Sequence, residues 1–246
     1  MNSENRDILV YSKNTIREGL VANKVKALYV LRRQASDPLV KLAKENAVNV
    51  IFTDEGELTK MVHNPGHQGF VAKVSSFEEV SLETIISICK QKSDPLLLIL
   101  DGIEDPHNLG AILRSADAFG VDGVLIKNKG EVSLNSTVAK VSTGAIFHVK
   151  VATVNNLSRA IQILKRNQFW IVASDGEAKI DYDEVDYSGP MALVVGSEGF
   201  GISRLVLENS DFIVKIPMVG HVNSLNASVA TALMLSMASH LRKIKK

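Results

Sequence analysis

The sequence has little cysteine, no long apolar run and no signal-peptide pattern, and each of these absences excludes a class of protein. Its 246 residues include one cysteine, Cys89, so neither an internal disulfide nor a multi-cysteine metal site is possible. No apolar run approaches the ~18–20 residues that cross a bilayer. The first residues, MNSENRDILV, lack the basic start and apolar segment of a signal peptide. We therefore expect a cytoplasmic protein without membrane contact, in which Cys89 is buried on the apolar side of a helix.

Aromatic residues and net charge are also low. Aromatics make up 5% of the chain and apolar residues 46%, so aliphatic side chains must fill the core. The formal net charge of +1 does not indicate a nucleic-acid binder, but the charges are unevenly distributed. Residues 1–75 hold 11 Lys and Arg against 8 Asp and Glu, with Lys24, Lys26, Arg32 and Arg33 near one another in sequence. These four are either ordinary surface charges or part of a phosphate-binding patch.

The hydrophobic pattern divides the chain into two α/β domains joined by a linker. Residues 1–75 form a small α/β domain, with strands predicted at 26–33, 48–53 and 69–76 and a helix at 37–47. Residues 76–94 resemble an acidic linker that runs into a helix. In 95–246, short apolar runs alternate with helix-like segments, which favours a mostly parallel sheet covered on both faces. The expected strands are 96–100, 123–126, 147–152, 169–174, 191–196 and 211–216.

Two helices of the second domain are clearly amphipathic. In 107–120 the apolar face is made by Leu109, Ile112, Leu113, Ala116 and Phe119. Arg114 falls on the opposite side of this helix. From Ala227 to about Lys243 the spacing of Val229, Leu233, Met237 and Leu241 predicts another apolar stripe, which core packing would explain.

Several catalytic signatures are absent from the sequence. It contains no G-x-G-x-x-G opening a helix, no G-x-x-x-x-G-K-[ST], no H-E-x-x-H and no G-x-S-x-G, and no pair of histidines has metal-ligand spacing. We expect no metal. Three polar loops stand out instead, at 101–120, 196–201 and 217–228, each after an apolar strand. In open α/β sheets ligands bind beyond the carboxyl ends of the strands, so these loops are the candidate site.

The three loops resemble the motifs of the SpoU/TrmH branch of the SPOUT methyltransferases. They are N-L-G-A-I-L-R-S-A-D-A-F-G, L-V-V-G-S-E-G-F-G-I-S and I-P-M-V-G-H-V-N-S-L-N-A-S-V-A. The N-terminal part, with V-H-N-P-G-H-Q-G-F-V-A-K-V, looks like the L30e-like RNA-binding domain of large-subunit rRNA guanosine 2′-O-methyltransferases. Two positions depart from the family pattern: a glycine usual near the start of the domain is replaced around Tyr11, and Ala227 stands where valine is common. Neither change affects a motif position expected to do chemistry.

The resemblance implies the fold, the reaction and the partners. It implies a deep trefoil knot in the C-terminal domain, a homodimer with composite active sites, and methylation of a ribose 2′-hydroxyl with S-adenosylmethionine as cofactor. The expected RNA is 23S rRNA, at the P-loop guanosine, rather than tRNA. The cofactor is expected against Val195, Gly196, Ile216, Pro217, Met218, Ser224, Leu225 and Asn226.

The resemblance also assigns the catalytic residues. Arg114 is expected to bind the phosphate beside the target ribose, since its planar guanidinium group can donate two parallel hydrogen bonds to an anion. Asn108 would bind the ribose or orient Arg114, although it would also suit a helix cap. Glu198 would orient Asn108 or Arg114. Ser224 and Asn226 would position the ribose and phosphate or the cofactor carboxylate, and Asn226 would also cap the last helix. With Arg114, the RNA-binding residues are Lys24, Lys26, Arg32 and Arg33.

Other functions stay open at this point. The same chemistry suits a tRNA ribose or the rRNA adenosine methylated by thiostrepton-resistance enzymes. A non-catalytic RNA-binding or ribosome-assembly protein would keep the fold, although the intact motif residues argue against it. A small-molecule α/β enzyme is disfavoured because no nucleophile or acid–base pair stands out.

Overall fold

The structure, a computed structural model, describes residues 7–221 and 224–244 and contains two compact units. The first unit holds the chain up to Phe77 together with Leu134–His148. The second holds Glu78–Ser133 and the chain from Val149 onward. The chain therefore passes between the units three times, and the division differs from the simple boundary predicted near residues 76–94.

The first unit is built on a four-stranded sheet with the order β1-β4-β2-β3. Strand β4 is antiparallel to β1 and β2, and β2 is parallel to β3. The strands and helices are β1 Ile8–Tyr11, α1 Lys13–Val21, β2 Val25–Leu31, η1 Arg32–Gln34, α2 Pro38–Glu45, β3 Asn49–Thr53, α3 Glu55–Val62, η2 Pro65–His67, β4 Phe70–Val74, α6 Ser136–Val141 and η3 Ala145–Phe147. The three predicted strands and the predicted helix of this region are all present.

The return segment, residues 134–148, belongs to the first unit because its contacts are with α1 and β1. The Thr15 hydroxyl donates to the Ala139 carbonyl oxygen at 3.2 Å in a buried environment. His148 Nε2 lies 2.9 Å from a carboxylate oxygen of Glu18. Gly144, at φ +97°, makes the turn between α6 and η3 in a conformation that favours glycine. The strand predicted at 147–152 consequently begins only at Val151.

The second unit is a seven-stranded sheet with the order β7-β6-β5-β10-β8-β11-β9, and its paired strands are parallel. This confirms the predicted mostly parallel α/β fold. Its elements are α4 Leu82–Cys89, β5 Leu96–Asp101, α5 Pro106–Ala118, β6 Gly123–Lys127, β7 Val151–Val154, α7 Leu157–Arg166, β8 Trp170–Ser174, β9 Ile180–Asp181, β10 Met191–Gly196, α8 Arg204–Asn209, β11 Phe212–Lys215 and α9 Ala227–Ile244.

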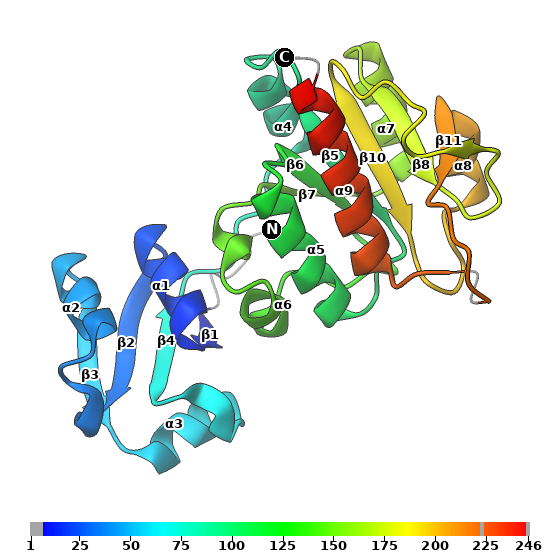
Figure 1. The fold of residues 1–246 in the computed structure, drawn as a ribbon. Coiled ribbons are helices and arrows are strands. Elements are labelled where there is room, and N and C mark those ends of the chain that lie inside the picture. Colours follow the sequence, from blue (N-terminus) through cyan, green and yellow to red (C-terminus); the bar gives the residue numbers. More distant parts are fainter. Residues whose placement is uncertain (1–6, 222–223, 245–246) are drawn as a thin grey trace. The chain divides into compact units, whose positions relative to one another are not determined.

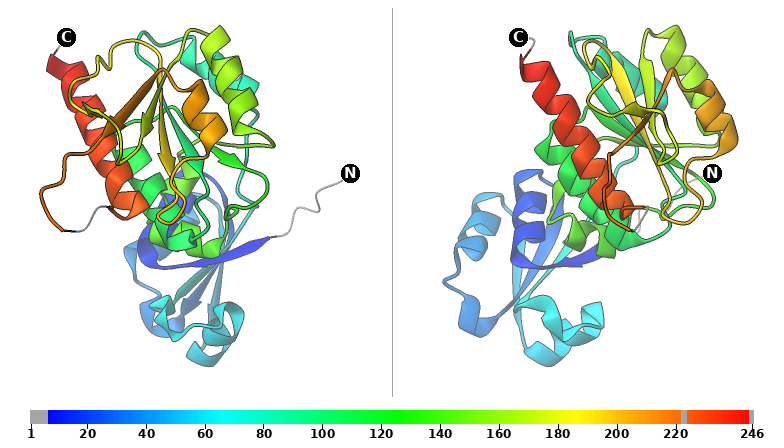
Figure 2. Two further views of the ribbon diagram at one scale, coloured as in Figure 1. Left: turned by 90° about the vertical axis from the view of Figure 1, so that its right-hand side faces the viewer. Right: turned by 45° about the vertical axis from the view of Figure 1, so that its right-hand side comes forward.

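Helices cover both faces of this sheet (Figures 1 and 2). Helices α4, α7 and α8 share one core with alternate residues of the central strands, such as Leu97 and Ile99 of β5. Helices α5 and α9 pack together on the opposite face. Cys89 of α4 is 2% exposed, which confirms its predicted burial, and burial raises the pKa of its thiol to about 12. The predicted linker thus ends in a helix that is part of this core.

Helix α9 packs through a face that the sequence analysis did not predict. Ala227, Thr231, Met234, Leu235 and Ala238 are buried. The stripe assigned to core packing is instead partly exposed, with Val229 at 47% and Leu233 at 38% exposure. That assignment was wrong because the helix carries apolar residues on two faces.

The trefoil knot implied by the resemblance stays a prediction, because strand order does not define how loops pass through one another.

Within residues 7–221 and 224–244, no helix combines the length and apolar character needed to span a membrane.

Candidate functional site

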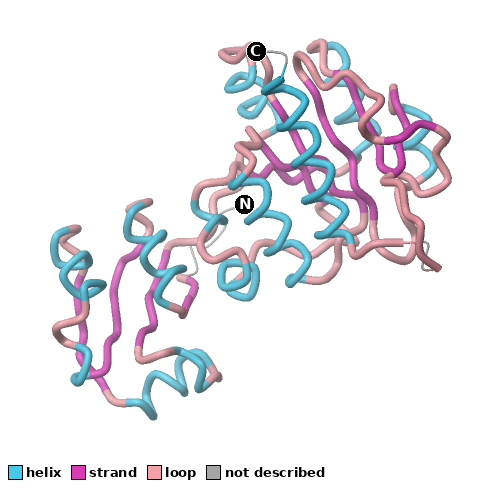
Figure 3. The backbone as a smooth tube through the Cα atoms, viewed as in Figure 1, coloured by secondary structure: helices cyan, strands magenta, loops and turns pink. Residues whose placement is uncertain are grey.

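The three predicted loops meet at one edge of the second unit. Strands β5 and β10 are adjacent and parallel, with Gly196 level with Asp101, so the loops that follow them leave the sheet together. Helices α5 and α9 begin at this edge, as the loop-to-helix boundaries in Figure 3 show. The prediction that these strand-end loops lie together is therefore confirmed.

The entrance of α5 leaves Asn108 free for interactions outside its own helix. Asp105 is the N-cap and accepts a hydrogen bond from the His107 backbone N–H at 2.8 Å, and Pro106 occupies the first turn. The capping role considered for Asn108 is thus taken by Asp105.

Asn108, Glu198 and Asn226 form a hydrogen-bonded cluster from the three loops. Asn108 Nδ2 donates to Glu198 Oε1 at 2.9 Å. Asn226 Nδ2 donates to Asn108 Oδ1 at 2.9 Å and also to Glu198 Oε1. The predicted contact between Glu198 and Asn108 is therefore present. Since each of the three side chains contacts the other two, the position of each depends on both others.

Asn226 also begins α9. Its Oδ1 accepts from the Ser228 backbone N–H at 2.9 Å and from the Val229 N–H at 3.4 Å, which is an N-cap arrangement. The side chain therefore caps through its oxygen and joins the cluster through its amide nitrogen, which confirms the predicted cap.

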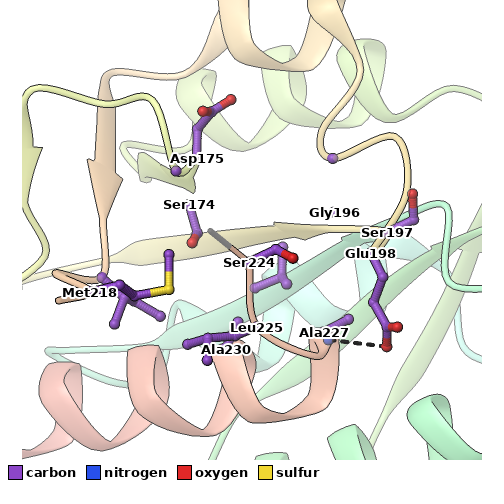
Figure 4. Close-up of a pocket in the computed structure, with 14 residues that line it drawn as sticks. Ser174, Asp175, Gly196, Ser197, Glu198, Met218, Ser224, Leu225, Ala227 and Ala230 are labelled. Carbon is purple, nitrogen blue, oxygen red and sulfur yellow. Dashed lines mark hydrogen bonds between the residues drawn. The ribbon is translucent and has the colours of Figure 1, made fainter. Parts of the chain in front are cut away.

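A pocket lies beside this cluster, between the ends of β8 and β10 and the start of α9 (Figure 4). Of the residues predicted to bind the cofactor, Val195, Gly196, Ile216, Met218, Ser224 and Leu225 line it. Pro217 and Asn226 do not line it. In Figure 4, Leu225 and Ala230 lie along α9 and Ser174 lies across the pocket from them.

The sequence analysis missed one wall of the pocket, formed by Ser174, Asp175 and Gly176. Ser174 is the last residue of β8 and the other two follow it, and β8 lies between β10 and β11 in the sheet. The strand-end rule would have found them, since D-G follows the predicted strand 169–174 directly.

Gly196 allows the loop after β10 to fold closely on itself. A Cβ at this position would collide with the backbone carbonyl of Gly201. The backbone N–H of Ser197 donates to the Gly201 carbonyl at 3.1 Å, and the Gly201 N–H donates back at 3.0 Å. The tight loop 197–201 therefore depends on glycine at 196 and places Glu198 at the pocket.

A second hollow adjoins the first pocket. Its lining residues are Gly102, Ile103, Glu104, Asp105, Asn108, Ser197, Glu198, Gly199, Phe200 and Ala227. Ser197, Glu198 and Ala227 line both spaces and form a shared wall. The Asn108–Glu198–Asn226 cluster thus lies at the boundary between the two spaces.

A buried ionic network supports two of the three loops that carry this cluster, the ones that follow β5 and β10. Lys127 Nζ donates to Asp101 Oδ1 at 2.8 Å, and the backbone N–H of Ser203 donates to Asp101 Oδ2 at 2.8 Å. Glu131 accepts from the backbone N–H groups of Gly102, at 2.7 Å, and Lys127, at 2.8 Å. Burial opposes the charge of Asp101, but the hydrogen bonds from Lys127 and Ser203 hold the pKa of its carboxyl below the ordinary 3.8.

The predicted RNA-binding residues belong to both units: Arg114 to the second, and Lys24, Lys26, Arg32 and Arg33 to the first. Arg114 is exposed on α5 and, among the described residues, forms no salt bridge. Lys24 precedes β2 whereas Arg32 and Arg33 follow it, and an extended strand separates them by roughly 26 Å. Lys26 pairs with Asp7 at 2.6 Å and Arg33 with Glu55 at 3.3 Å. Proximity in sequence was misleading because a strand extends the chain.

No group of three or more potential metal ligands among His, Cys, Asp and Glu occurs in the described parts of the chain.

Comparisons with known families match both units. The SpoU rRNA Methylase family profile matches residues 95–236, and the profile for RNA 2′-O ribose methyltransferase substrate binding matches residues 9–80. A TrmH family tRNA/rRNA methyltransferase of Staphylococcus saprophyticus is 43% identical over 236 residues, which cover 93% of this chain and 94% of the relative.

Solved structures share the complete fold. A crystal structure of an RNA 2′-O ribose methyltransferase is 29% identical, with a TM-score of 0.81, and the match covers 97% of this chain and 90% of that one. The SpoU methyltransferase AviRb from Streptomyces viridochromogenes, solved in complex with AdoMet, has a TM-score of 0.82 at 22% identity over 96% of this chain and 91% of its own.

Proposed function

The chain belongs to the SpoU rRNA methylase family, whose members methylate RNA, and we propose that it methylates a ribose 2′-hydroxyl of 23S rRNA with S-adenosylmethionine as cofactor. The target is the P-loop guanosine. The observation that carries the proposal is the Asn108–Glu198–Asn226 cluster on the wall shared by two adjoining spaces. That wall is where a methyl donor and a ribose would meet.

The residues of the first pocket fit S-adenosylmethionine. Leu225, Ala230 and Met218 offer apolar surface for the adenosyl group, and Ser174 and Ser224 offer hydroxyls for its polar groups. In the part of the chain that the structure describes, the lining includes the carboxylates Asp175 and Glu198 and no Lys or Arg, which suits a cationic sulfonium. When bound, the cofactor supplies an electrophilic methyl group.

The residues of the protein orient the acceptor ribose and stabilise charge. Glu198 Oε1 accepts from both asparagines and from the Ala227 N–H at 3.4 Å, so its role is to fix these groups. Asn108 then holds the ribose at the shared wall. Holding both reactants in the reactive orientation lowers the activation free energy of a two-substrate reaction by a large amount.

Arg114 binds the phosphate beside the target ribose. Its guanidinium has no salt-bridge partner among the described residues, so it is available to an anion. Guanidinium does not deprotonate in proteins, so Arg114 is not the base. The 2′-hydroxyl proton passes to a phosphate oxygen or water while Arg114 stabilises the developing charge.

The first unit recognises the RNA. The substrate-binding profile over residues 9–80 supports this role, as do the exposed Arg32 and Arg33 just after β2. If both contact phosphates, replacing both with alanine should lower RNA affinity and reduce its salt dependence. Replacement of Lys41, exposed on α2, is the control. An unchanged salt dependence would contradict phosphate contacts.

The functional unit is a homodimer with composite sites. The partly exposed Val229 and Leu233 on α9, one helical turn apart, support an apolar interface on this helix.

The test is transfer of labelled methyl from S-adenosylmethionine to unmodified 23S rRNA, with tRNA as a parallel substrate. We expect incorporation into rRNA. Incorporation into tRNA alone would identify the runner-up substrate. Cofactor and RNA binding without transfer to either would identify a non-catalytic RNA-binding protein.

A further inference from the structure

We propose that Phe200 is the stacking residue for the base of the acceptor nucleotide, and that the second hollow receives this nucleoside. The inference rests on the proposed function and adds the residue that holds the base.

The aromatic side chain of Phe200 is exposed to solvent. It is 96% exposed, in a unit whose other phenylalanines, Phe119, Phe169 and Phe212, are buried or partly buried. A single exposed apolar residue is common on protein surfaces, so exposure alone does not define a site. The surroundings of Phe200 supply the argument.

The backbone under Phe200 is held in place by hydrogen bonds. The Phe200 N–H donates to Ser197 Oγ at 3.2 Å, inside the loop closed by the paired bonds between Ser197 and Gly201. Gly201 has φ +64°, a conformation that favours glycine at this end of the loop. The ring therefore projects from an ordered turn and needs no large rearrangement to meet a ligand.

The position of Phe200 relative to the cluster is suited to a nucleoside. The second hollow is lined by Phe200 together with Asn108 and Glu198. A ribose placed at the shared wall has its 2′-oxygen toward the cofactor pocket, which leaves its base to lie in the hollow. Among the described residues, the lining includes Glu104, Asp105 and Glu198 but no Lys or Arg, so the hollow suits an uncharged nucleoside better than a phosphate.

A base in this hollow would gain binding free energy by stacking on the Phe200 ring. Specific RNA recognition commonly uses unstacked bases that lie on aromatic side chains. Removing one stacking ring weakens binding by about 5- to 150-fold. Any base has a face to stack, so Phe200 would hold the nucleotide while other contacts select it.

The experiment compares Phe200→Ala, Phe200→Leu and Phe200→Tyr in the full chain, with KM for 23S rRNA, kcat, cofactor affinity and sedimentation measured for each. We expect KM to rise about 5- to 150-fold in the alanine and leucine variants and to stay near wild type in the tyrosine variant. Cofactor affinity should not change. Leu205→Ala is the matched control, because Leu205 is 63% exposed on α8 and lines neither space.

Three results would overturn the inference. One is an unchanged KM in Phe200→Ala. Another is a KM for Phe200→Leu that stays as near to wild type as that of Phe200→Tyr, because that would indicate apolar packing without stacking. The third is a change of oligomeric state in Phe200→Ala, which would assign the ring to a second copy of the chain. In each case, methyl transfer by the wild-type protein would still support the proposed function. An inactive wild-type protein would contradict both the proposed function and the role of Phe200.

Discussion

The side-chain amide of Asn226 donates a hydrogen bond to the side-chain oxygen of Asn108 at 2.9 Å, across 118 positions of sequence. The same Asn226 side chain caps α9 through its oxygen. One residue thus ties the start of the last helix to the start of α5 and to Glu198. The two roles use different atoms, so substitutions can separate them.

Asn226→Asp should retain the cap and lose the cluster. Aspartate accepts from the Ser228 N–H as asparagine does, but it has no N–H for Asn108 and brings a second carboxylate toward Glu198. We expect thermal stability to stay within about 1 kcal/mol of wild type while kcat falls by roughly 10- to 100-fold. Asn226→Ala removes both roles and should lower both quantities. Equal activity of the aspartate variant and wild type would show that the cluster has no catalytic role.

Gly196→Ala should disrupt the first pocket. The added methyl group would collide with the Gly201 carbonyl, so the loop that carries Glu198 must move. Calorimetry should show cofactor affinity reduced at least tenfold, about 1.4 kcal/mol. Gly199→Ala is the control, since a Cβ there meets nothing within 4 Å. Similar affinities for the two variants would contradict the dependence of the pocket on this close approach.

Arg114→Ala should lose activity without losing cofactor binding. A charge-assisted bond to phosphate is worth about 1.5–3 kcal/mol, so we expect kcat/KM for RNA to fall by roughly 10- to 150-fold. Arg114→Lys should recover only part of this, because an ammonium lacks the planar fork. If the alanine variant also fails to bind the cofactor, the residue has a structural role that its exposure on α5 does not suggest.

The Asp101–Lys127 pair should make stability fall in acid. The folded state holds the pKa of Asp101 below 3.8, so the pair stabilises above pH 3.8 and this contribution is lost as pH falls through the lower folded pKa. Asp101→Asn should therefore cost about 3 kcal/mol at pH 7 and less at pH 3, measured by urea unfolding. Asp117→Asn, at an exposed position of α5, is the control. A cost that does not depend on pH would contradict the ionic role.

Val229→Asp should dissociate the proposed homodimer. A carboxylate on the exposed α9 stripe would be buried without a partner in an apolar interface, while the monomer keeps it in water. We expect analytical ultracentrifugation to show monomers, with the circular dichroism spectrum unchanged. A variant that sediments like a dimeric wild type would place the interface elsewhere.

The sequence predicted which loops lie together better than it predicted the packing around them. Arg114 was expected opposite the apolar face of α5, and it is exposed while Ile112 and Leu113 are fully buried. Helical spacing is sufficient for this because α5 has one apolar face. Motif spacing likewise brought Asn108, Glu198 and Asn226 to one sheet edge, since parallel strands end together.

The failures have a common physical origin in tertiary context. Periodicity could not choose between Val229 and Met234 on α9, since both lie on apolar faces and only packing against β10 and α5 decides. Residues 134–148 were assigned to the second domain by continuity, although their contacts, such as that of Ala139 with Thr15, are with the first unit. No local pattern encodes such a return of the chain.

The most direct test is mass spectrometry of nucleosides from unmodified 23S rRNA after reaction with the protein and S-adenosylmethionine. The proposed function predicts 2′-O-methylguanosine, mapped to the P-loop and absent with Arg114→Ala. Methylation on a base, or none in RNA that the protein binds, would contradict it.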